Sequence, residues 1–575
     1  MAGTALTLPA MSLNPTVWRR HPFVLLLAAL LVCTPPCLMG LFRTDATNHM
    51  EVLSLVTSQE TWLRQRAGDS QAWLSPSWNG ELRVRKPPLT VWLHLLAWSG
   101  MEQDAPVASL VARARATAAA AAALLLTATF WIGWQAGGRR GAVAAVLTTG
   151  TMLLFTKQAR LASYDIHLAA WSTLSVACGW ASLRHTGSGR GAAWRALAAA
   201  VSLGAACLSK SPIALLFVGL ALAVETATSP RRATALRRSA AILLSGCALA
   251  LPWYAWVAIA KPGAGLTLVS DYASEPLRPK PPWYYASATG YVFPWCVPFL
   301  AALVYARRHA GAAARRANPH WWWFVLALVC LSIPGAKRPR YLLPIFPAIG
   351  LLVADAWLAA GETARRRSTR VVDAVHAGVL AVISLAPAAA VLLRSPLLPR
   401  GIGQQAILAQ LWPPAAVAAT VALLACAAAT HLACRRQARL AGLWFTALWT
   451  AVLGAWAAHS YANSAEGRFA AREDSLRVSA VIGDQPVAYL RADRSDLQPD
   501  AKFLLYTRRI VPAILPGGLP GFASSGGTGA VYVIARDSPA HEEILRGVDF
   551  EPVQSYVDGG RQPRRLYRSP LTAPP

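Results

Sequence analysis

Lysine is rare in the first 460 residues, and each occurrence adjoins or lies within an apolar stretch. The positions are Lys86, Lys157, Lys210, Lys261, Lys280 and Lys337, and three arginines, Arg160, Arg338 and Arg340, lie close to two of them in the chain. Cations gathered at a membrane surface favour an anionic ligand, for which a lipid-linked phosphate is the obvious candidate. The alternative is that single lysines only extend their ammonium groups to the lipid interface.

Two carboxylates accompany these cations. Asp45 lies in the segment Arg43-Thr-Asp-Ala-Thr-Asn-His-Met-Glu51, directly after an apolar block, and Asp165 lies close to the start of another block. A carboxylate in such a position can cap a helix, pair with an arginine or act as a general base. Two of them at the ends of different blocks, facing several cations, favour the chemical role over the structural ones.

The elements that must position these residues are membrane helices. Hydrophobic residues make up 55% of the 575-residue chain and charged residues 14%, with a mean hydropathy of +0.37, whereas soluble domains contain about 25% charged residues. The apolar residues fall into blocks, most of a length that can span a bilayer. The blocks are 22–41, 87–99, 107–135, 141–156, 161–183, 192–208, 211–226, 239–260, 285–306, 320–335, 340–360, 371–393, 411–433 and 438–460.

Arginine clusters between the blocks indicate which loops face the cytoplasm. They follow a pattern of every second loop, at 139–140, 184–195, 231–238, 307–316, 365–370 and 435–439. By the positive-inside rule these loops are cytoplasmic, as is the N-terminus with Arg19–Arg20. The alternation holds only if block 87–99, which is too short to span, lies at the interface. The sequence thus predicts about 13 transmembrane helices in residues 1–460, with a first external loop at 43–106 that carries juxtamembrane helices.

The net charge of +28 is accounted for by these loops, so a nucleic-acid partner is not predicted. The polar tail, residues 461–575, is expected to form a small external α/β domain. Helices are predicted at 465–482 and 541–546, and buried strands at 486–490, 502–506 and 530–535. The fold class is therefore an all-α polytopic membrane protein with a small C-terminal α/β extramembrane domain. No spacing matches a metal site and no cofactor is predicted, although the sequence leaves a divalent-metal requirement open.

Several short motifs, in order along residues 20–360, resemble bacterial membrane glycosyltransferases of the GT-C fold. The resemblance is to the branch that contains protein O-mannosyltransferases and the lipid A aminoarabinose (4-amino-4-deoxy-L-arabinose) transferase. In this chain Ala46 replaces a glutamate usual in that branch, and Ser211 replaces a glycine. The matching motifs are Asp45–Glu51, Trp78-Asn-Gly80, Lys86-Pro-Pro-Leu89, Arg160…Asp165, Lys210-Ser-Pro212, Pro252-Trp-Tyr254 and Lys337–Pro344.

The resemblance implies an activity and a set of roles. Such enzymes transfer a sugar from a polyprenyl-phosphate carrier to an acceptor outside the membrane, with inversion at the anomeric carbon. It implies Asp45 and Asp165 as the catalytic pair, with Asp45 as the base and Asp165 orienting the acceptor or the sugar. The substrate-binding candidates are Glu51, which orients the loop, Lys86, Arg160, Lys210, Lys337, Arg340 and Tyr341.

The expected protein is therefore a multi-pass enzyme of the bacterial inner membrane, with a cytoplasmic N-terminus and a periplasmic C-terminal domain. Its expected partners are a polyprenyl-phosphate sugar donor, membrane lipids, and a glycolipid, glycan or protein acceptor. A transporter or flippase of lipid-linked glycans is the alternative, although transporters usually show repeats and ionisable residues near the midplane. The sequence does not name the sugar or the acceptor.

Overall fold

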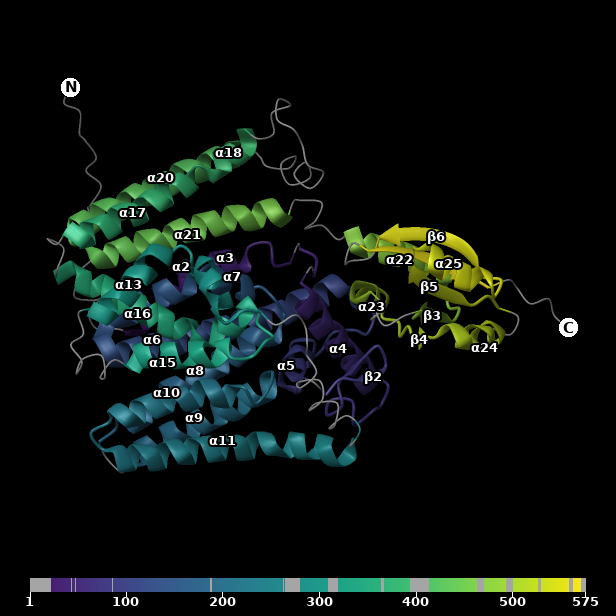
Figure 1. Ribbon diagram of the computed structural model, residues 1–575, viewed down its shortest axis with the longest axis horizontal. Coiled ribbons are helices and arrows are strands. Elements are labelled where there is room, and N and C mark those ends of the chain that lie inside the picture. Colours follow the sequence, from purple (N-terminus) through teal and green to yellow (C-terminus); the bar gives the residue numbers. More distant parts are fainter. Residues whose placement is uncertain are drawn as a thin grey trace, which may run out of the picture.

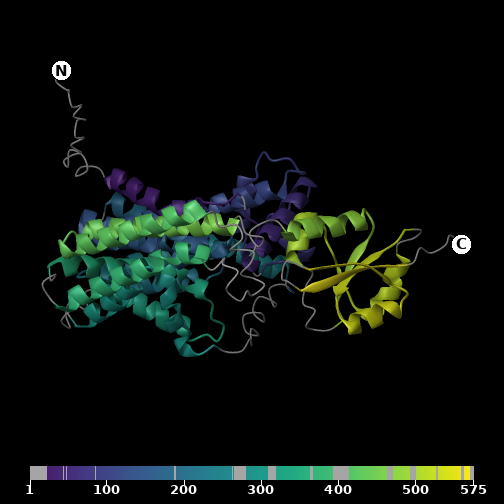
Figure 2. The ribbon, with the colours of Figure 1, turned by 90° about the horizontal axis from the view of Figure 1, so that it is seen from above.

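The computed structural model describes residues 22–569 apart from several gaps, so Arg19–Arg20 and Arg43 lie outside the described residues. The gaps are 43, 47, 85, 187–188, 262, 264–279, 309–318, 363–366, 393–412, 463–469, 493–499, 526–528 and 558–561. The chain forms a bundle of long helices with a small mixed domain at one end (Figures 1 and 2). The described part of residues 43–106, the segment predicted to be the first external loop, lies between the two (Figure 1).

The helices of the bundle pack around a core of small and aromatic apolar side chains. They are α2 (Pro22–Cys33), α3 (Pro35–Leu38), α6 (Val107–Gly150), α7 (Leu153–Ala159), α8 (Tyr164–Leu183), α9 (Arg190–Ser209), α10 (Ala214–Thr228), α11 (Arg232–Ala260), α13 (Cys296–Arg308), α15 (Pro319–Ser332), α16 (Phe346–Glu362), α17 (Arg367–Ser384), α18 (Ala386–Leu392), α20 (Pro413–Arg435) and α21 (Arg439–Ala462). Two 3-10 helices, η1 (Pro282–Val292) and η2 (Pro339–Ile345), lie between them in sequence.

Within the described residues, 7 helical segments are long and apolar enough to cross a membrane, and four further apolar helices are shorter. The chain is thus a mostly helical protein with membrane-spanning character, as the composition predicts. The shorter helices are Pro22–Cys33, Ala214–Thr228, Cys296–Arg307 and Pro319–Ser332.

Helix α6 reverses direction in its middle. The backbone leaves helical geometry at Gly137 and Gly138, and Gly138 has a φ of 59° in the left-handed region that favours glycine. A Cβ on Gly133 would lie 2.8 Å from the carbonyl oxygen of Gly141, so the two halves cross at backbone contact. This confirms the break that the sequence places between blocks 107–135 and 141–156.

The same reversal shows that the Arg139–Arg140 turn and the C-terminal domain are at opposite ends of the bundle. The segment just before α6 contacts the C-terminal domain, where Arg508 donates to the carbonyls of Gln103 and Ala105. The first half of α6 has about 30 residues and therefore runs for roughly 45 Å before it turns. The Arg139–Arg140 turn and the C-terminal domain consequently lie at opposite ends of the bundle.

The predicted first external loop contains two helices and a hairpin in its described residues. Helix α4 (His49–Arg66) begins at Asn48, whose side chain accepts a hydrogen bond from the Met50 amide. Strands β1 (Ser77–Trp78) and β2 (Glu81–Leu82) are antiparallel and joined by Asn79-Gly80, both with positive φ. Helix α5 (Leu89–Ala97) has nine residues, which confirms that the 87–99 block is too short to span.

The C-terminal domain is a five-stranded mixed sheet with short helices. The strand order is β4-β3-β5-β7-β6; β3 pairs in parallel with β4 and β5, and β7 is antiparallel to β5 and β6. The strands are β3 (Val487–Leu490), β4 (Ala513–Ile514), β5 (Tyr532–Arg536), β6 (Glu551–Val557) and β7 (Pro563–Arg568). The helices are α22 (Ala470–Ile482), α23 (Ala501–Thr507), η3 (Pro516–Gly518), α24 (Leu519–Ser524) and α25 (Pro539–Arg546).

One predicted strand of this domain is wrong. Residues 502–506 lie within α23, which Asp500 caps by accepting a hydrogen bond from the Lys502 amide. Phe503, Leu504, Leu505 and Tyr506 are all buried, because α23 is enclosed between its own domain and α4. A short apolar run buried on every side has no periodicity that separates a helix from a strand.

Candidate active site

Asp165 lies in a cluster of cations that three elements bring together. Asp165 is in the first turn of α8, Lys210 directly follows α9, and Arg340 and Tyr341 belong to η2. The Lys210 Nζ donates to Asp165 Oδ1 at 2.5 Å, and the Arg340 Nε lies 3.4 Å from Asp165 Oδ2. Both cations also face the Tyr341 ring, at 4.6 Å for Lys210 and 5.5 Å for Arg340. Four of the predicted site residues therefore meet at one point.

The cluster retains hydrogen-bonding capacity. The Arg340–Asp165 contact is an ion pair without hydrogen-bond alignment, and among the described residues neither Arg340 Nε nor Asp165 Oδ2 has a hydrogen-bond partner. The buried hydroxyl of Ser163 is likewise unpaired within the described part of the chain. A buried polar group without a partner is costly, and of these groups Arg340 Nε and the Ser163 hydroxyl can donate to the oxygens of a ligand.

A small cavity of about 100 Å³ adjoins these unpaired groups. It lies between the start of α4, helix α7, the start of α8 and η2. Its volume admits one small group, such as a phosphate, and not a whole lipid headgroup. The lining residues are Asn48, Met50, Leu154, Lys157, Gln158, Ser163, Asp165, Tyr291, Pro339 and Arg340.

Positive charge extends from the cluster to the first external loop. His49 is the first residue of α4. Its pKa is lowered mainly by burial and also by the nearby positive charges of Arg83 and Arg340. Lys86 follows Arg83 in the same connection and is half-buried just before α5. Val84, between them, packs against Trp253 and Val257 of α11, which fixes this stretch to the bundle.

Asp45 lies in a different environment. Its side chain is 2% exposed; the Tyr506 hydroxyl donates to its Oδ1, and the Lys502 Nζ donates to its Oδ2 at 3.2 Å. Both partners belong to α23 of the C-terminal domain. Burial raises the pKa of Asp45, although the Lys502 charge acts in the opposite direction. The side-chain partners of Asp45 therefore differ from those of Asp165, which are Lys210 and Arg340.

Glu51 and Arg160 make structural contacts. Both Glu51 oxygens bind the Arg115 guanidinium, at 2.7 and 2.9 Å, and Oε1 also accepts from the Ala162 amide. Arg115 donates further to the carbonyls of Leu41, Thr44 and Asp45, which fixes the start of the external loop. Arg160 donates to the Pro36 carbonyl at 2.6 Å.

Lys337 is 2% exposed and donates to two backbone carbonyls, Pro334 at 2.6 Å and Lys280 at 3.0 Å. It thus holds the connection that leads to η2. Its predicted contact with phosphate stays a prediction, as do the predicted roles of Glu51, Lys86 and Arg160. Within the described residues, no group of three or more His, Cys, Asp or Glu side chains could hold a metal ion.

Comparison with known proteins identifies the fold. Residues 97–266 match the family described as dolichyl-phosphate-mannose-protein mannosyltransferase. The whole architecture matches ArnT from Cupriavidus metallidurans bound to undecaprenyl phosphate, with a TM-score of 0.69 and 19% identity over 97% of this chain and 100% of that one. The chain has the GT-C fold of the ArnT-like glycosyltransferases.

Two further similarities agree with this fold. The chain is 23% identical to an undecaprenyl phosphate-alpha-4-amino-4-deoxy-L-arabinose arabinosyl transferase of Pseudomonas savastanoi pv. phaseolicola, over 62% of this chain and 66% of the relative. That match spans just under two thirds of the relative's length. The archaeal oligosaccharyltransferase AglB from Archaeoglobus fulgidus is more distant, with a TM-score of 0.51 and 11% identity over 96% of this chain and 74% of that one.

Three residues that bind Asp45 or the start of its loop were not predicted from the sequence. Arg115 could have been found, because an arginine within an apolar block must have a partner in the bundle. Lys502 and Tyr506 gave no such signal, since they lie 457 and 461 residues from Asp45 in a segment that reads as ordinary domain core.

Proposed function

We propose that this protein is an inverting glycosyltransferase that moves a sugar from a polyprenyl-phosphate donor to a lipid A-like glycolipid on the external face of the inner membrane. The names of the relatives support an undecaprenyl-phosphate carrier and an aminoarabinose-type pentose. The observation that carries the proposal is the Asp165–Lys210–Arg340 cluster, whose unpaired donor faces a phosphate-sized cavity.

In the proposed reaction the cluster binds the phosphate of the donor. Asp165 holds Lys210 and Arg340 in place, and both cations stabilise the negative charge that the phosphate gains as it leaves. The acceptor oxygen forms a bond to the anomeric carbon from the opposite face, while the bond from that carbon to the phosphate oxygen breaks. The electron pair of the broken bond leaves with the phosphate.

The acceptor hydroxyl must lose its proton in the same step, and Asp45 is the proposed base. Its buried position supports this role, because a raised pKa makes a carboxylate a stronger base. Lys502 and Tyr506 cover Asp45 in this structure, so α23 must withdraw from the carboxylate when the acceptor enters. We propose Lys86 as a second contact of the donor phosphate, because it lies in the connection just before α5.

The proposed orientation has thirteen membrane crossings, a cytoplasmic N-terminus and a periplasmic C-terminal domain. It is supported by the reversal of α6, which sets the Arg139–Arg140 turn opposite the C-terminal domain. Reporter fusions after Arg140 and after Tyr461 should report opposite sides of the membrane. If both fusions report the same side, this orientation is wrong.

The activity is tested with the full chain in lipid nanodiscs, undecaprenyl-phosphate aminoarabinose and lipid A, with product mass as the readout. The wild type should add one pentose mass to each lipid A molecule that it modifies, and the Asp165→Asn variant should be far slower. A wild type that transfers no sugar from any polyprenyl-phosphate donor, but moves such lipids between leaflets, would instead support the flippase alternative.

A further inference from the structure

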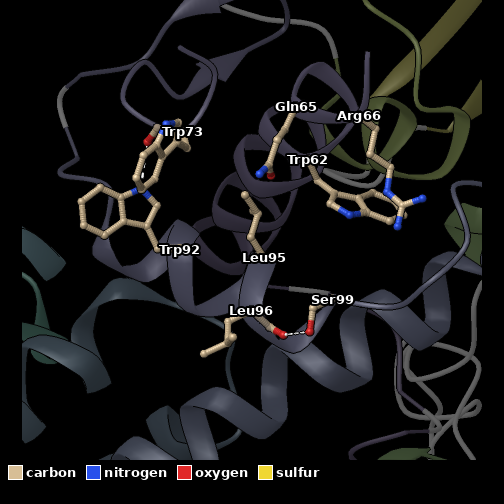
Figure 3. Close-up of a pocket in the computed structure, with 8 residues that line it drawn as sticks. All are labelled: Trp62, Gln65, Arg66, Trp73, Trp92, Leu95, Leu96 and Ser99. Atoms are coloured by element: carbon tan, nitrogen blue, oxygen red, sulfur yellow. Dashed lines mark hydrogen bonds between the residues drawn. The ribbon is translucent and has the colours of Figure 1, made fainter. Parts of the chain in front are cut away.

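A large pocket in the first external loop is separate from the ionic cluster. It has a volume of about 590 Å³ and lies between the C-terminal half of α4 and α5. Figure 3 shows two aromatic groups across it, Trp73 with Trp92 on one side and Trp62 beneath Arg66 on the other. Its volume is that of a small-ligand site, where pockets of about 300–1,000 Å³ are usual.

The indole rings of this pocket are held in fixed orientations. The Trp92 Nε1 donates to the Trp73 carbonyl at 2.8 Å, and the two rings are 5.6 Å apart. The Arg66 guanidinium lies 4.9 Å from the Trp62 ring, and Trp62 meets Trp98 edge-on at 5.9 Å. A binding surface with rings already in place loses little conformational entropy when a ligand binds.

The chemistry of the pocket matches a phosphorylated sugar. Indole faces pack well against the C–H faces of sugar rings, and the Gln65 amide can serve sugar hydroxyls. Arg66 is the one charged residue among the side chains that line the pocket, so a bound group with net charge should be an anion. Leu96, 69% exposed at the edge, can contact the acyl chains of the same molecule.

Helix α5 links this pocket to the proposed active site. Its inward side carries Thr90, whose hydroxyl donates at 3.0 Å to the carbonyl of Ser209, the residue before Lys210. Its other side carries Trp92 and Leu96, which line the pocket. The two sites are thus on opposite sides of one helix, roughly 10 Å across.

We propose that this tryptophan pocket binds the phosphorylated sugar headgroup of the acceptor glycolipid. The inference rests on the proposed function for the identity of the acceptor. The small cavity beside Asp165 is too small for such a headgroup, whereas the larger pocket lies across α5 from the Ser209–Lys210 segment. The competing explanation is that the tryptophans only anchor the loop in the lipid headgroup layer.

Binding is tested with Trp73→Ala, because the backbone carbonyl of Trp73, and not its side chain, accepts the Trp92 hydrogen bond. The matched control is Trp131→Ala in α6, since Trp131 is 47% exposed and Trp73 is 48% exposed. Full-length protein in phosphatidylcholine nanodiscs with equal lipid A and phosphatidylglycerol is analysed by native mass spectrometry. The wild type and Trp131→Ala should retain lipid A preferentially, and Trp73→Ala should lose about three- to tenfold of that preference.

The variant Arg66→Gln tests separately whether the pocket recognises the phosphate group of lipid A. It should reduce the preference for lipid A over its dephosphorylated form and leave the binding of the dephosphorylated form unchanged. Equal retention of lipid A and phosphatidylglycerol by the wild type, or an unaltered preference in Trp73→Ala, would overturn the proposal in favour of simple anchoring.

Kinetics separate this proposal from the proposed function. The acceptor KM of Trp73→Ala should rise about three- to tenfold while its donor KM stays at the wild-type value. If Trp73→Ala is active and its acceptor KM is normal, the assignment of the pocket as the acceptor site is wrong, but the proposed function is unaffected. Preferential lipid A binding by a wild type that transfers no sugar would instead refute the proposed function and leave the pocket assignment standing.

Discussion

The two candidate catalytic carboxylates are both 2% exposed, but they obtain their partners in opposite ways. Asp165 is bound by Lys210 and Arg340, which lie at the ends of elements of the bundle itself. Asp45 is bound by Lys502 and Tyr506 of a domain that follows the last bundle helix. The first site is therefore complete within the bundle, whereas the state of the second depends on how the C-terminal domain is docked.

The largest effect is expected for Asp45→Asn, which keeps the size of the side chain but cannot take a proton. Turnover should fall by about two orders of magnitude or more, the usual loss for a general base, with the donor KM nearly unchanged. Single-turnover transfer with saturating donor measures this. Normal turnover in the variant would reduce Asp45 to a docking residue for α23.

Lys210→Met should instead weaken the use of the polyprenyl-phosphate donor. Loss of a charge-assisted phosphate contact of roughly 1.5–3 kcal/mol should lower kcat/KM for the donor about tenfold or more. Lys157→Met is the control, since Lys157 lines the same cavity but is not among the ion-paired residues of the cluster. If both variants lose the same kcat/KM for the donor, positive charge near the cavity is enough, and the Asp165–Lys210 ion pair is not specifically required.

Docking of the C-terminal domain can be weakened without touching either carboxylate. The Asn79 side chain accepts from the Val511 amide at 2.7 Å and donates to the Val511 carbonyl at 2.8 Å. Asn79→Gly removes both hydrogen bonds but tolerates the φ of 55°, and should weaken docking by about 1–3 kcal/mol.

Hydrogen exchange at the amides of α23, which packs against α4, measures this loss, because the Val511 amide itself loses its acceptor in the variant. Asn79→Ala should cost more than Asn79→Gly, because alanine adds strain at positive φ. Unchanged exchange in Asn79→Gly would mean that other contacts, such as those of Arg508 with the carbonyls of Gln103 and Ala105, suffice to dock the domain.

The smallest effect near neutral pH is expected for Lys502→Met. Lys502 lowers the pKa of Asp45, so its removal should raise that pKa, and the acid limb of the kcat/KM profile should move to higher pH. Tyr506 and Arg115 also face Asp45 and remain in place. Arg546→Met, on an exposed pair of the same domain, should leave the profile unchanged. A profile that does not move in Lys502→Met would contradict this coupling.

The bundle and its ionic cluster were largely predictable because their signals are local. The apolar block 87–99 was predicted to be too short to span, and α5 has nine residues. A break was predicted between blocks 107–135 and 141–156, and α6 leaves helical geometry there at Gly137 and Gly138. Lysines and carboxylates are few enough in this part of the chain to be conspicuous. The sequence therefore predicts Asp165, Lys210, Arg340 and Tyr341 as site residues, and these four side chains meet in the structure.

The environment of Asp45 was not predictable for the opposite reason. Its partners lie in a helix that the sequence presents as an apolar run, and periodicity could not distinguish that helix from a strand. No local pattern indicates which surface of a later domain will cover a loop residue. The prediction that Asp45 is a base could therefore be made, but not the prediction that it would be covered.

The Asn79–Val511 pair also determines when, during synthesis, the first and last parts of the chain can pack together. The two residues are 432 positions apart, which corresponds to roughly 20–90 s of translation at about 5–20 residues per second. During that interval the apolar side chains of α4 and the hairpin that later pack on α23 have no permanent cover. A chain that ended before Val511 would stay in the membrane with this apolar surface unburied, so the last hundred residues are needed to complete the packing of the first hundred.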